Sequence, residues 1–258
     1  GEELKAVVKR GLQASMVGQV LVEESILGWD ELELEVVRDS KGKMITVCYI
    51  ENIDPLGVHT GDSICCAPML TISKELQKEL QKQAYMIVDA IGVIGGTNVQ
   101  FAHDPVSGRI CVIEINPRTS RSSALASKAT GFPIALISAM LATGINLDEI
   151  PCGKYGTLDK YVPNGDHLVI KFARWAFEKF PKAQDKLGTQ MKAVGEVMSV
   201  GKTYKEAFQK AIRSLEIGRY GLGNAKDFAS KSRDELLDML HNTTSERQFI
   251  MYEAIRKG

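Results

Sequence analysis

Four side chains with oxygen ligands alternate along two neighbouring segments of the chain. Asn98 and Gln100 are two residues apart in the first segment, and Glu114 and Asn116 are two residues apart in the second. One carboxylate among carboxamides offers only oxygen ligands, which suit Mg²⁺ or Mn²⁺ ions that bridge phosphates. If the two segments lie side by side, these residues predict a metal site for a phosphate-bearing ligand.

Two arginines follow this set directly in the sequence. Arg118 and Arg121 offer planar guanidinium groups that can bind an anion with two donors each. A Glu and an Asn on a strand are more often part of a solvated face, and that interpretation also applies here. The density of oxygen ligands beside two arginines favours a phosphate and metal site, but geometry alone leaves both interpretations open.

A hairpin is the element that would position these residues. Segments 98–102 and 111–116 each alternate polar and apolar residues, which is typical of a strand with two different faces. Residues 104–108 (DPVSG) have the composition of a turn. If the two strands pair, their parity places all four oxygen-bearing side chains on one face.

A second alternating segment, residues 31–38, carries three glutamates on one side. Residues 39–42 form a predicted turn, and residues 44–50 return as an antiparallel partner. Neighbouring glutamates repel each other unless cations or donors face them. A solvated outer face is the favoured interpretation, and the wall of a cleft is the alternative.

Residues 51–63 (ENIDPLGVHTGDS) form a loop with an unusual composition. It contains two glycines, a proline, a histidine and several oxygen-bearing side chains. Such a loop can bind a monovalent cation and approach a phosphate through its backbone. His59 fits this role and a purely structural hydrogen bond equally well.

The remaining elements follow from capping and periodicity. Ser73 and Gly92 are the predicted start and stop of the longest helix, and residue 219 is the predicted domain boundary. Further helices are expected at 2–9 (ended by Gly11), 120–130, about 134–143, 203–217, 232–240 and 245–257, and short strands at 19–23 and 64–69.

The composition narrows the function classes. The 258 residues include 32 Lys+Arg and 32 Asp+Glu, and this zero net charge argues against a nucleic-acid partner bound by bulk charge. The apolar runs are too short for a membrane span, and no signal peptide is recognisable, so we expect no membrane partner. Five cysteines without zinc spacing are expected to be free thiols in the cytoplasm.

Several stretches resemble the large chain of the carbamoyl-phosphate synthase family, which consists of ATP-grasp enzymes. The matching stretches are 24–39 (ESILGWDELELEVVRD), 51–68 (ENIDPLGVHTGDSICCAP), 98–102 (NVQFA), 113–131 (IEINPRTSRSSALASKATG) and 190–201 (QMKAVGEVMSVG). They are most similar to the first of that chain's two ATP-grasp halves. The resemblance implies an α+β fold: the C-terminal part of an ATP-grasp domain at 1–218, with an antiparallel sheet and packed helices, followed by the start of a helical oligomerisation region at 219–258.

The resemblance also implies roles for individual residues. The implied metal ligands are Gln100, Glu114 and Asn116, and the implied catalytic residues are Arg118 and Arg121, beside bicarbonate. The implied ATP-binding residues are Glu24, Ile26, Glu31, Gly57, Val58, His59, Gln100 and Glu114. The implied potassium site consists of Glu31, Asn52, Asp54, Val58 through its carbonyl, and Ser63.

The activity implied by the resemblance is that of an ATP-dependent ligase. Bicarbonate would be phosphorylated to carboxyphosphate, which ammonia converts to carbamate on the way to carbamoyl phosphate, for pyrimidine and arginine biosynthesis. The implied cofactors are ATP, two Mg²⁺ or Mn²⁺ ions and K⁺. The implied partners are the rest of the large chain and a glutaminase small subunit that supplies ammonia, within an oligomeric full enzyme.

One family feature is missing, and two alternatives stay open. The glycine-rich phosphate loop expected before the nucleotide linker has no counterpart before Gly18, so we expect a fragment that binds ATP poorly and is inactive alone. A biotin-carboxylase-like ATP-grasp enzyme is one alternative, although the RTSRSS run after Pro117 departs from that family. A non-catalytic assembly module is the other.

Overall fold

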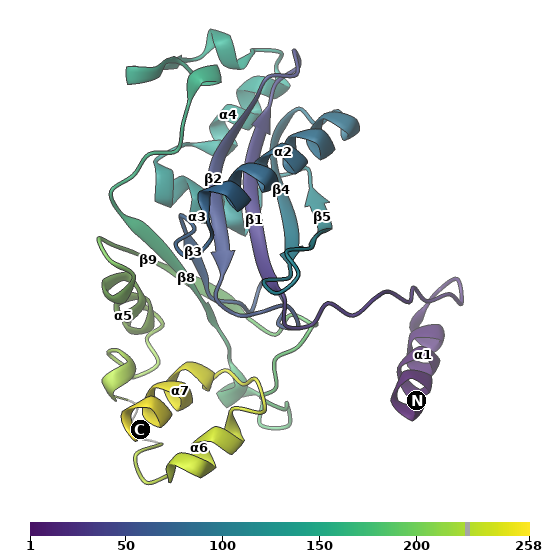
Figure 1. The fold of residues 1–258 in the computed structure, drawn as a ribbon, viewed down its shortest axis with the longest axis vertical. Coiled ribbons are helices and arrows are strands. Elements are labelled where there is room, and N and C mark those ends of the chain that lie inside the picture. The colour runs from purple at the N-terminus through teal and green to yellow at the C-terminus, as the bar shows by residue number, and fades with distance from the viewer. Residues whose placement is uncertain (225–227) are drawn as a thin grey trace.

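A seven-stranded antiparallel sheet forms the centre of the molecule (Figure 1). The computed structural model describes residues 1–224 and 228–258. The strand order is β5-β4-β1-β2-β3-β8-β9. The strands are β1 (Asp30–Arg38), β2 (Met44–Asn52), β3 (Cys65–Ala67), β4 (Gly95–His103), β5 (Ile110–Asn116), β8 (Leu168–Arg174) and β9 (Gly195–Gly201), with a separate short pair β6 (Pro151–Cys152) and β7 (Gly156–Thr157).

Helices pack on both faces of this sheet, as expected for an α+β fold. The α-helices are α1 (Glu2–Ala14), α2 (Lys74–Ile91), α3 (Arg121–Thr130), α4 (Ile134–Ala142), α5 (Tyr204–Ser214), α6 (Arg233–Met239) and α7 (Arg247–Arg256). Short 3-10 helices occur at Leu147–Glu149, Gly153–Tyr155, Leu158–Lys160, Phe177–Lys179 and Leu222–Asn224.

The predicted hairpin of β4 and β5 is confirmed, and the structure adds its register. Asn98 pairs with Asn116, and Gln100 pairs with Glu114 across the two strands. The strands are antiparallel, and a register irregularity follows directly after Gln100. The four oxygen-bearing side chains therefore share one face of the sheet, as their parity predicts.

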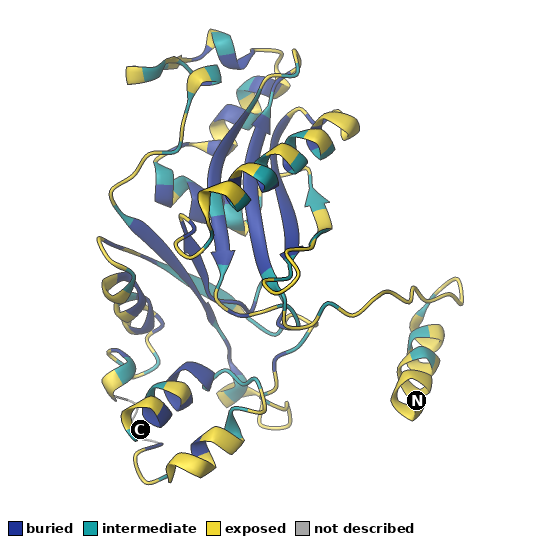
Figure 2. Ribbon diagram, in the orientation of Figure 1, coloured by how far each residue is buried: buried dark blue, intermediate teal, exposed yellow. Residues whose placement is uncertain are grey.

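Helix α2 covers one face of the central strands. Leu80, Ala84 and Val88 of this helix pack in one cluster with apolar residues of β1 and β4 such as Leu34 and Val99. The predicted caps are confirmed: the Ser73 side chain accepts a hydrogen bond from the Leu76 amide, and Gly92 ends the helix in the left-handed conformation. Helix α2 is therefore amphipathic, with its outer face in solvent (Figure 2).

Helices α3 and α4 cover the opposite face. Small residues in α3, such as Ala126 and Ala129, pack closely against β2 residues such as Val47 in a second cluster. Ser120 caps α3 and Gly131 ends it, as expected. Among the described residues, no single helix is long and apolar enough to cross a membrane; α3 and α4 pass only as a pair, which is bent by 111°.

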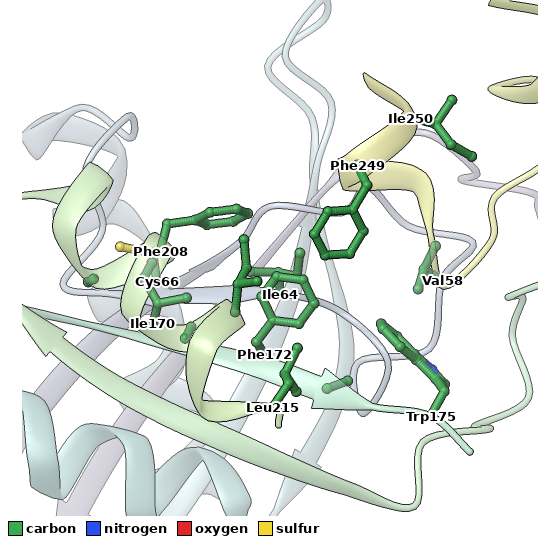
Figure 3. Packing of buried hydrophobic residues seen from close by; sticks show 14 of the residues in the cluster. Val58, Ile64, Cys66, Ile170, Phe172, Trp175, Phe208, Leu215, Phe249 and Ile250 are labelled. Atoms are coloured by element: carbon green, nitrogen blue, oxygen red, sulfur yellow. The ribbon is translucent and has the colours of Figure 1, made fainter. Parts of the chain in front are cut away.

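A third core joins the far end of the sheet to the C-terminal helices (Figure 3). Phe172 of β8 packs with Phe208 of α5 in an edge-to-face arrangement with ring centroids 5.6 Å apart. Phe249 and Ile250 of α7 belong to the same buried cluster. The helical C-terminal segment is thereby packed directly on the sheet.

Two sequence-based expectations at the N-terminal end are wrong. Helix α1 continues through Gly11 to Ala14, because one glycine in an exposed helix is only a modest cost. Residues 19–23, expected as a strand, are irregular and exposed. Helix α1 has no buried residue (Figure 2), so no packing restricts this part of the chain. Near the other end, α5 stops at Ser214, before the expected Ile217.

The five cysteines are all free, as expected. Cys48, Cys65 and Cys66 are buried, whereas Cys111 and Cys152 are partly exposed. Burial raises the pKa of Cys66 to about 12 and also raises the pKa of Cys48 and Cys65. These three thiols are therefore unreactive core residues.

Candidate active site

A cleft of about 280 Å³ lies over the face of the β4–β5 hairpin. Seven of the residues predicted from sequence line it: His59, Asn98, Gln100, Glu114, Asn116, Arg118 and Arg121. Residues without a predicted role line the same cleft, namely Thr60, Gly61, Cys65, Ser120, Ser122, Leu125, Lys171 and Met191. The structure thus gathers the predicted metal ligands and both predicted arginines at one place.

The amide and carboxylate groups in the cleft are linked to one another. The Asn116 amide donates to Glu114 Oε1 at 2.8 Å, and Arg118 donates to Asn116 Oδ1 at 3.2 Å. Gln100 Nε2 donates to Asn98 Oδ1 at 3.2 Å. With its amide nitrogen engaged in this way, Gln100 has its carbonyl oxygen left for a cation or another donor.

The donor set fits a hard divalent cation that is held jointly with phosphates. Glu114 is exposed and contributes a carboxylate, while Gln100 and Asn116 contribute amide oxygens. No group of three or more His, Cys, Asp or Glu side chains that could hold a metal occurs at 1–224 or 228–258. Mg²⁺ commonly uses one or two carboxylates and takes its other ligands from water and substrate phosphates. The cleft therefore suits a metal that arrives with a nucleotide.

The three glutamates of β1 are buried, which contradicts the favoured interpretation of a solvated face. Glu31, Glu33 and Glu35 are only 1%, 0% and 1% exposed. They lie on β1 beside β4, where Glu33 pairs with Gln100 and Glu35 pairs with Asn98. None of the three lines the cleft itself; Glu33 contacts residues that do, such as Asn98 and Ser122.

Donors from distant segments satisfy two of these carboxylates. Glu33 accepts hydrogen bonds from Asn52 at 2.9 Å, Asn98 at 2.9 Å and Ser122 at 2.7 Å. Glu35 accepts from Asn98 at 3.0 Å and from two serines at the start of α3. The positive end of a helix also favours negative charge at this position. Burial nevertheless raises the pKa of Glu35 to about 8.

Glu31 is less completely satisfied. Its Oε1 accepts the Thr60 hydroxyl, but its Oε2 is buried without a hydrogen-bond partner in the described part of the chain. Burial, and then the charge of Glu33, raise the pKa of Glu31 to about 7. A buried carboxylate oxygen of this kind can accept a donor or a cation supplied by a ligand.

The other residues of the predicted potassium site are divided between two environments. The Asn52 amide donates to the Glu31 carbonyl at 3.4 Å, so these two residues are in contact. Asp54 instead binds the guanidinium of Arg247 with both oxygens. The Ser63 hydroxyl donates to the His59 carbonyl at 3.3 Å, and Val58 is buried in the third core.

The loop between β2 and β3 is held close to residues 24–30, the predicted nucleotide linker. Leu56 and the linker exchange two backbone hydrogen bonds of 2.9 Å, with Gly28 and Trp29. Gly57 has φ of +118°, and a Cβ atom there would lie 2.9 Å from the Leu27 side chain, so glycine is required. His59 Nδ1 accepts the Gly61 amide at 2.9 Å. His59 therefore both orders the loop and lines the cleft.

The linker itself carries the two predicted adenine-binding residues. Glu24 is exposed, and Arg109 binds its carboxylate with two hydrogen bonds of 2.8 and 2.9 Å. This ion pair lowers the pKa of Glu24. The carbonyl of Ile26 accepts a hydrogen bond from the Trp29 amide at 3.3 Å, within a turn.

The two predicted catalytic arginines are available for an anion. Arg118 makes hydrogen bonds to Asn116 and to the Thr119 carbonyl, and Arg121 contacts the sulfur of Met191 at 3.5 Å. Both are exposed, and neither has a carboxylate partner within the portion that the structure describes. Their charge therefore stays available to a bound anion.

Lys171 is a cleft residue that sequence reasoning missed. It lies on β8 with 4% exposure and donates to the Thr60 carbonyl at 2.8 Å. Burial lowers its pKa, but the surrounding acidic groups Cys65, Glu33 and Glu196 outweigh burial and raise it. One signal was present: Lys171 is the single charged residue in the segment 168–173 (LVIKFA), and the other five residues are apolar. A lone lysine inside a buried strand indicates a partner for buried acids.

Sequence comparisons identify the family of the chain. Residues 1–150 match the family described as carbamoyl-phosphate synthase L chain, ATP binding domain, and residues 196–258 match its oligomerisation domain. The chain is 52% identical over its full length to a carbamoyl phosphate synthase large chain, N-terminal section, of Methanopyrus kandleri. It is also 52% identical to the carbamoyl phosphate synthase large chain of Archaeoglobus fulgidus. It spans 46% and 24% of these relatives, respectively.

Solved structures show the same fold at low sequence identity. The biotin carboxylase domain of a Hydrogenobacter thermophilus 2-oxoglutarate carboxylase, in complex with MgADP, ADP and bicarbonate, matches with a TM-score of 0.61 and 16% identity, over 86% of this chain and 51% of that one. A Rhizobium etli pyruvate carboxylase matches with a TM-score of 0.57 and 17% identity, over 80% of this chain and 23% of that one. The fold and the cleft define an ATP-grasp protein.

Within that class, the sequence comparison selects the family. The chain belongs to the carbamoyl-phosphate synthase large-chain family. The resemblance found in the sequence is thereby confirmed. The likeness to biotin carboxylases, at 16% identity, is one of fold alone. The boundary predicted at residue 219 stays a prediction.

Proposed function

We propose that this chain carries the metal and anion side of an ATP-dependent step that phosphorylates bicarbonate to carboxyphosphate. The observation that carries the proposal is the meeting of Gln100, Glu114 and Asn116 with Arg118 and Arg121 in one cleft. Phosphoryl transfer needs positioning and charge neutralisation more than covalent chemistry from the protein. The cleft offers both.

The residues of the cleft divide these tasks. Gln100, Glu114 and Asn116 would hold the divalent ions, which when bound neutralise the charge on the β- and γ-phosphates of ATP. Arg118 and Arg121 would orient bicarbonate and stabilise the charge on the transferred phosphoryl group. Bicarbonate is already an anionic nucleophile, so the proposal needs no protein base.

The nucleotide would be bound along the linker and its neighbouring loop. Glu24 and Ile26 would bind the adenine side and Glu31 the ribose, while Gly57, Val58 and His59 approach the phosphates. A monovalent cation, K⁺ in this proposal, would fill the position beside the unpartnered Oε2 of Glu31. The Thr60 hydroxyl contacts the same carboxylate and the Asn52 amide contacts the Glu31 carbonyl, so both side chains lie close to this residue.

The later steps belong to a larger assembly in this proposal. Ammonia from a glutaminase subunit would convert carboxyphosphate to carbamate, and the rest of the large chain would carry the pathway to carbamoyl phosphate in the cytoplasm. The match of residues 196–258 to an oligomerisation domain supports assembly with other parts of the large chain. A chain that spans only part of its relatives is expected to depend on those parts for turnover.

A segment exchange tests this function. In the Methanopyrus kandleri section, residues 1–258 replace the matched part, and bicarbonate-dependent ATP hydrolysis is measured with the C-terminal section present. We expect activity with the wild-type segment and a loss of about 10²–10³-fold with Glu114→Gln. Glu79→Gln, on the exposed side of α2, is the matched control and is expected to keep the activity.

The competing function is a non-catalytic assembly module. It predicts that Glu114→Gln and Glu79→Gln have the same effect in the exchanged protein. It also predicts that circular dichroism and oligomeric state respond equally to both variants. Equal ATP hydrolysis in these two proteins would contradict the catalytic proposal.

A further inference from the structure

The loop at residues 53–64 is tied to the C-terminal helix α7 by one buried side chain. Arg247 Nε donates to Asp54 Oδ1, and Arg247 Nη2 donates to Asp54 Oδ2, both at 2.6 Å. The two side chains are 9% and 6% exposed. A two-donor, short and buried contact fixes the orientation of both partners.

The same arginine makes further contacts on each side of this pair. Its Nη1 donates to the Thr244 carbonyl at 3.1 Å, directly before α7, and its Nη2 lies 3.5 Å from the Asp62 carbonyl. Its guanidinium carbon is 5.3 Å from the centre of the Trp175 ring. Arg247 therefore joins the beginning of α7, both ends of the loop and the end of β8.

Asp62, at the far end of the loop, is fixed by its own contacts. Its carboxylate accepts hydrogen bonds from Trp175 Nε1 at 3.0 Å and from the amides of Lys192 and Ala193 at 2.9 and 2.6 Å. Apolar packing surrounds this network: Val58 of the loop and Phe249 of α7 lie in one core (Figure 3). The loop thus has a polar and an apolar attachment to the helical segment.

The opposite side of this loop faces the cleft. Thr60 contacts Glu31, and His59 and Gly61 line the cleft. The Asp54 Oδ2 that Arg247 binds also accepts the Ile64 amide at 2.9 Å. Arg247 is therefore connected to the cleft through a chain of direct contacts, although it is not itself a cleft residue.

We propose that Arg247 is a positioning residue through which the C-terminal helical segment sets the conformation of the loop at the nucleotide site. The role of that loop at a nucleotide rests on the proposed function; the coupling itself rests on the contacts described above. In this arrangement, a displacement of α7 within an assembly would alter the loop and hence nucleotide and K⁺ binding.

Hydrogen exchange on the 258-residue chain tests the coupling without any ligand. In Arg247→Gln we expect amides at 53–64 to exchange about tenfold faster or more, while the β4–β5 hairpin keeps its protection. Arg247→Lys keeps the charge but loses the planar guanidinium that donates two hydrogen bonds to Asp54, and it should give an intermediate effect. Arg256→Gln, in the same helix with an exposed side chain paired to Glu253, is the control and should leave the loop unchanged.

Two results would overturn the coupling. One is unchanged exchange at 53–64 in Arg247→Gln; the other is equal acceleration in the loop and in the hairpin, which would show an effect on overall stability only. If Arg247→Gln fails to fold, Arg247→Lys decides by the same criteria.

A second measurement concerns the site itself. Calorimetric titration of the exchanged Methanopyrus kandleri protein with MgADP at increasing KCl should show that Arg247→Lys needs about tenfold more KCl than the same protein without this substitution, with similar affinity at saturating KCl. A loss of affinity that is the same at every KCl concentration would contradict positioning. An exchanged protein without this substitution that does not bind MgADP would contradict the proposed function, while the hydrogen-exchange experiment still decides the coupling.

Discussion

The glutamates of β1 and the glutamate of β5, two strands separated by β4 in the sheet, have opposite environments. On β1, Glu33 and Glu35 are buried and accept hydrogen bonds from donors of several segments. On the edge strand β5, Glu114 is exposed and accepts a hydrogen bond from Asn116 alone among the described residues. Both strands alternate polar and apolar residues. The difference shows that the donors facing a carboxylate, and not its spacing, decide whether it serves structure or remains available to a cation.

The largest expected effect is a difference in stability between substitutions of a buried β1 glutamate and of the exposed Glu114. Glu33→Ala removes the common acceptor of Asn52, Asn98 and Ser122, and the buried donors left behind should lower the free energy of unfolding by about 2–4 kcal/mol. Glu114→Ala should change it by less than about 0.5 kcal/mol, because its position is exposed. Urea denaturation measures both. An equal decrease in the free energy of unfolding in both variants would contradict a structural role that is specific to Glu33.

A smaller effect should appear in the pH dependence of stability. Burial raises the pKa of Glu35 from 4.5 to about 8 and, together with Glu33, raises that of Glu31 to about 7. Between the ordinary glutamate pKa of 4.5 and these raised pKa values, the folded protein keeps protons that the unfolded chain releases. The free energy of unfolding should therefore decrease as the pH rises from about 5 to 8. Glu35→Gln, which cannot ionise, should make this decrease less steep.

Urea midpoints measured across this pH range check that effect. The wild-type protein and Glu35→Gln should differ most near pH 8 and least near pH 5. The same slope in both proteins would show that Glu35 is not buried in the way the structure describes.

Local sequence signals were sufficient to predict much of the fold. The parity of segments 98–102 and 111–116 predicted that Gln100 and Glu114 share one face, because side chains alternate along a strand. Ser73 and Gly92 predicted the limits of α2, since capping depends on neighbouring residues. These features need no information from distant segments.

The misjudged features depend on distant segments. The burial of Glu33 on β1 depends on donors such as Asn98 and Ser122, which lie far away in the sequence. The pairing of Asp54 with Arg247 joins residues 193 positions apart. The alternation at 31–38 therefore predicted a strand but not which face it buries. At residues 19–23 an apolar pattern predicted a strand, but the described chain provides no neighbouring strand there.

The central claim is that the hairpin face binds divalent cations together with nucleotide phosphates. The most direct test is the anomalous scattering of Mn²⁺ in crystals grown with ADP. An Mn²⁺ peak within bonding distance of both the Glu114 carboxylate and the ADP phosphates, with Gln100 as a further ligand, is the result that we predict. Ordered ADP phosphates with Mn²⁺ bound away from Glu114 would contradict the claim.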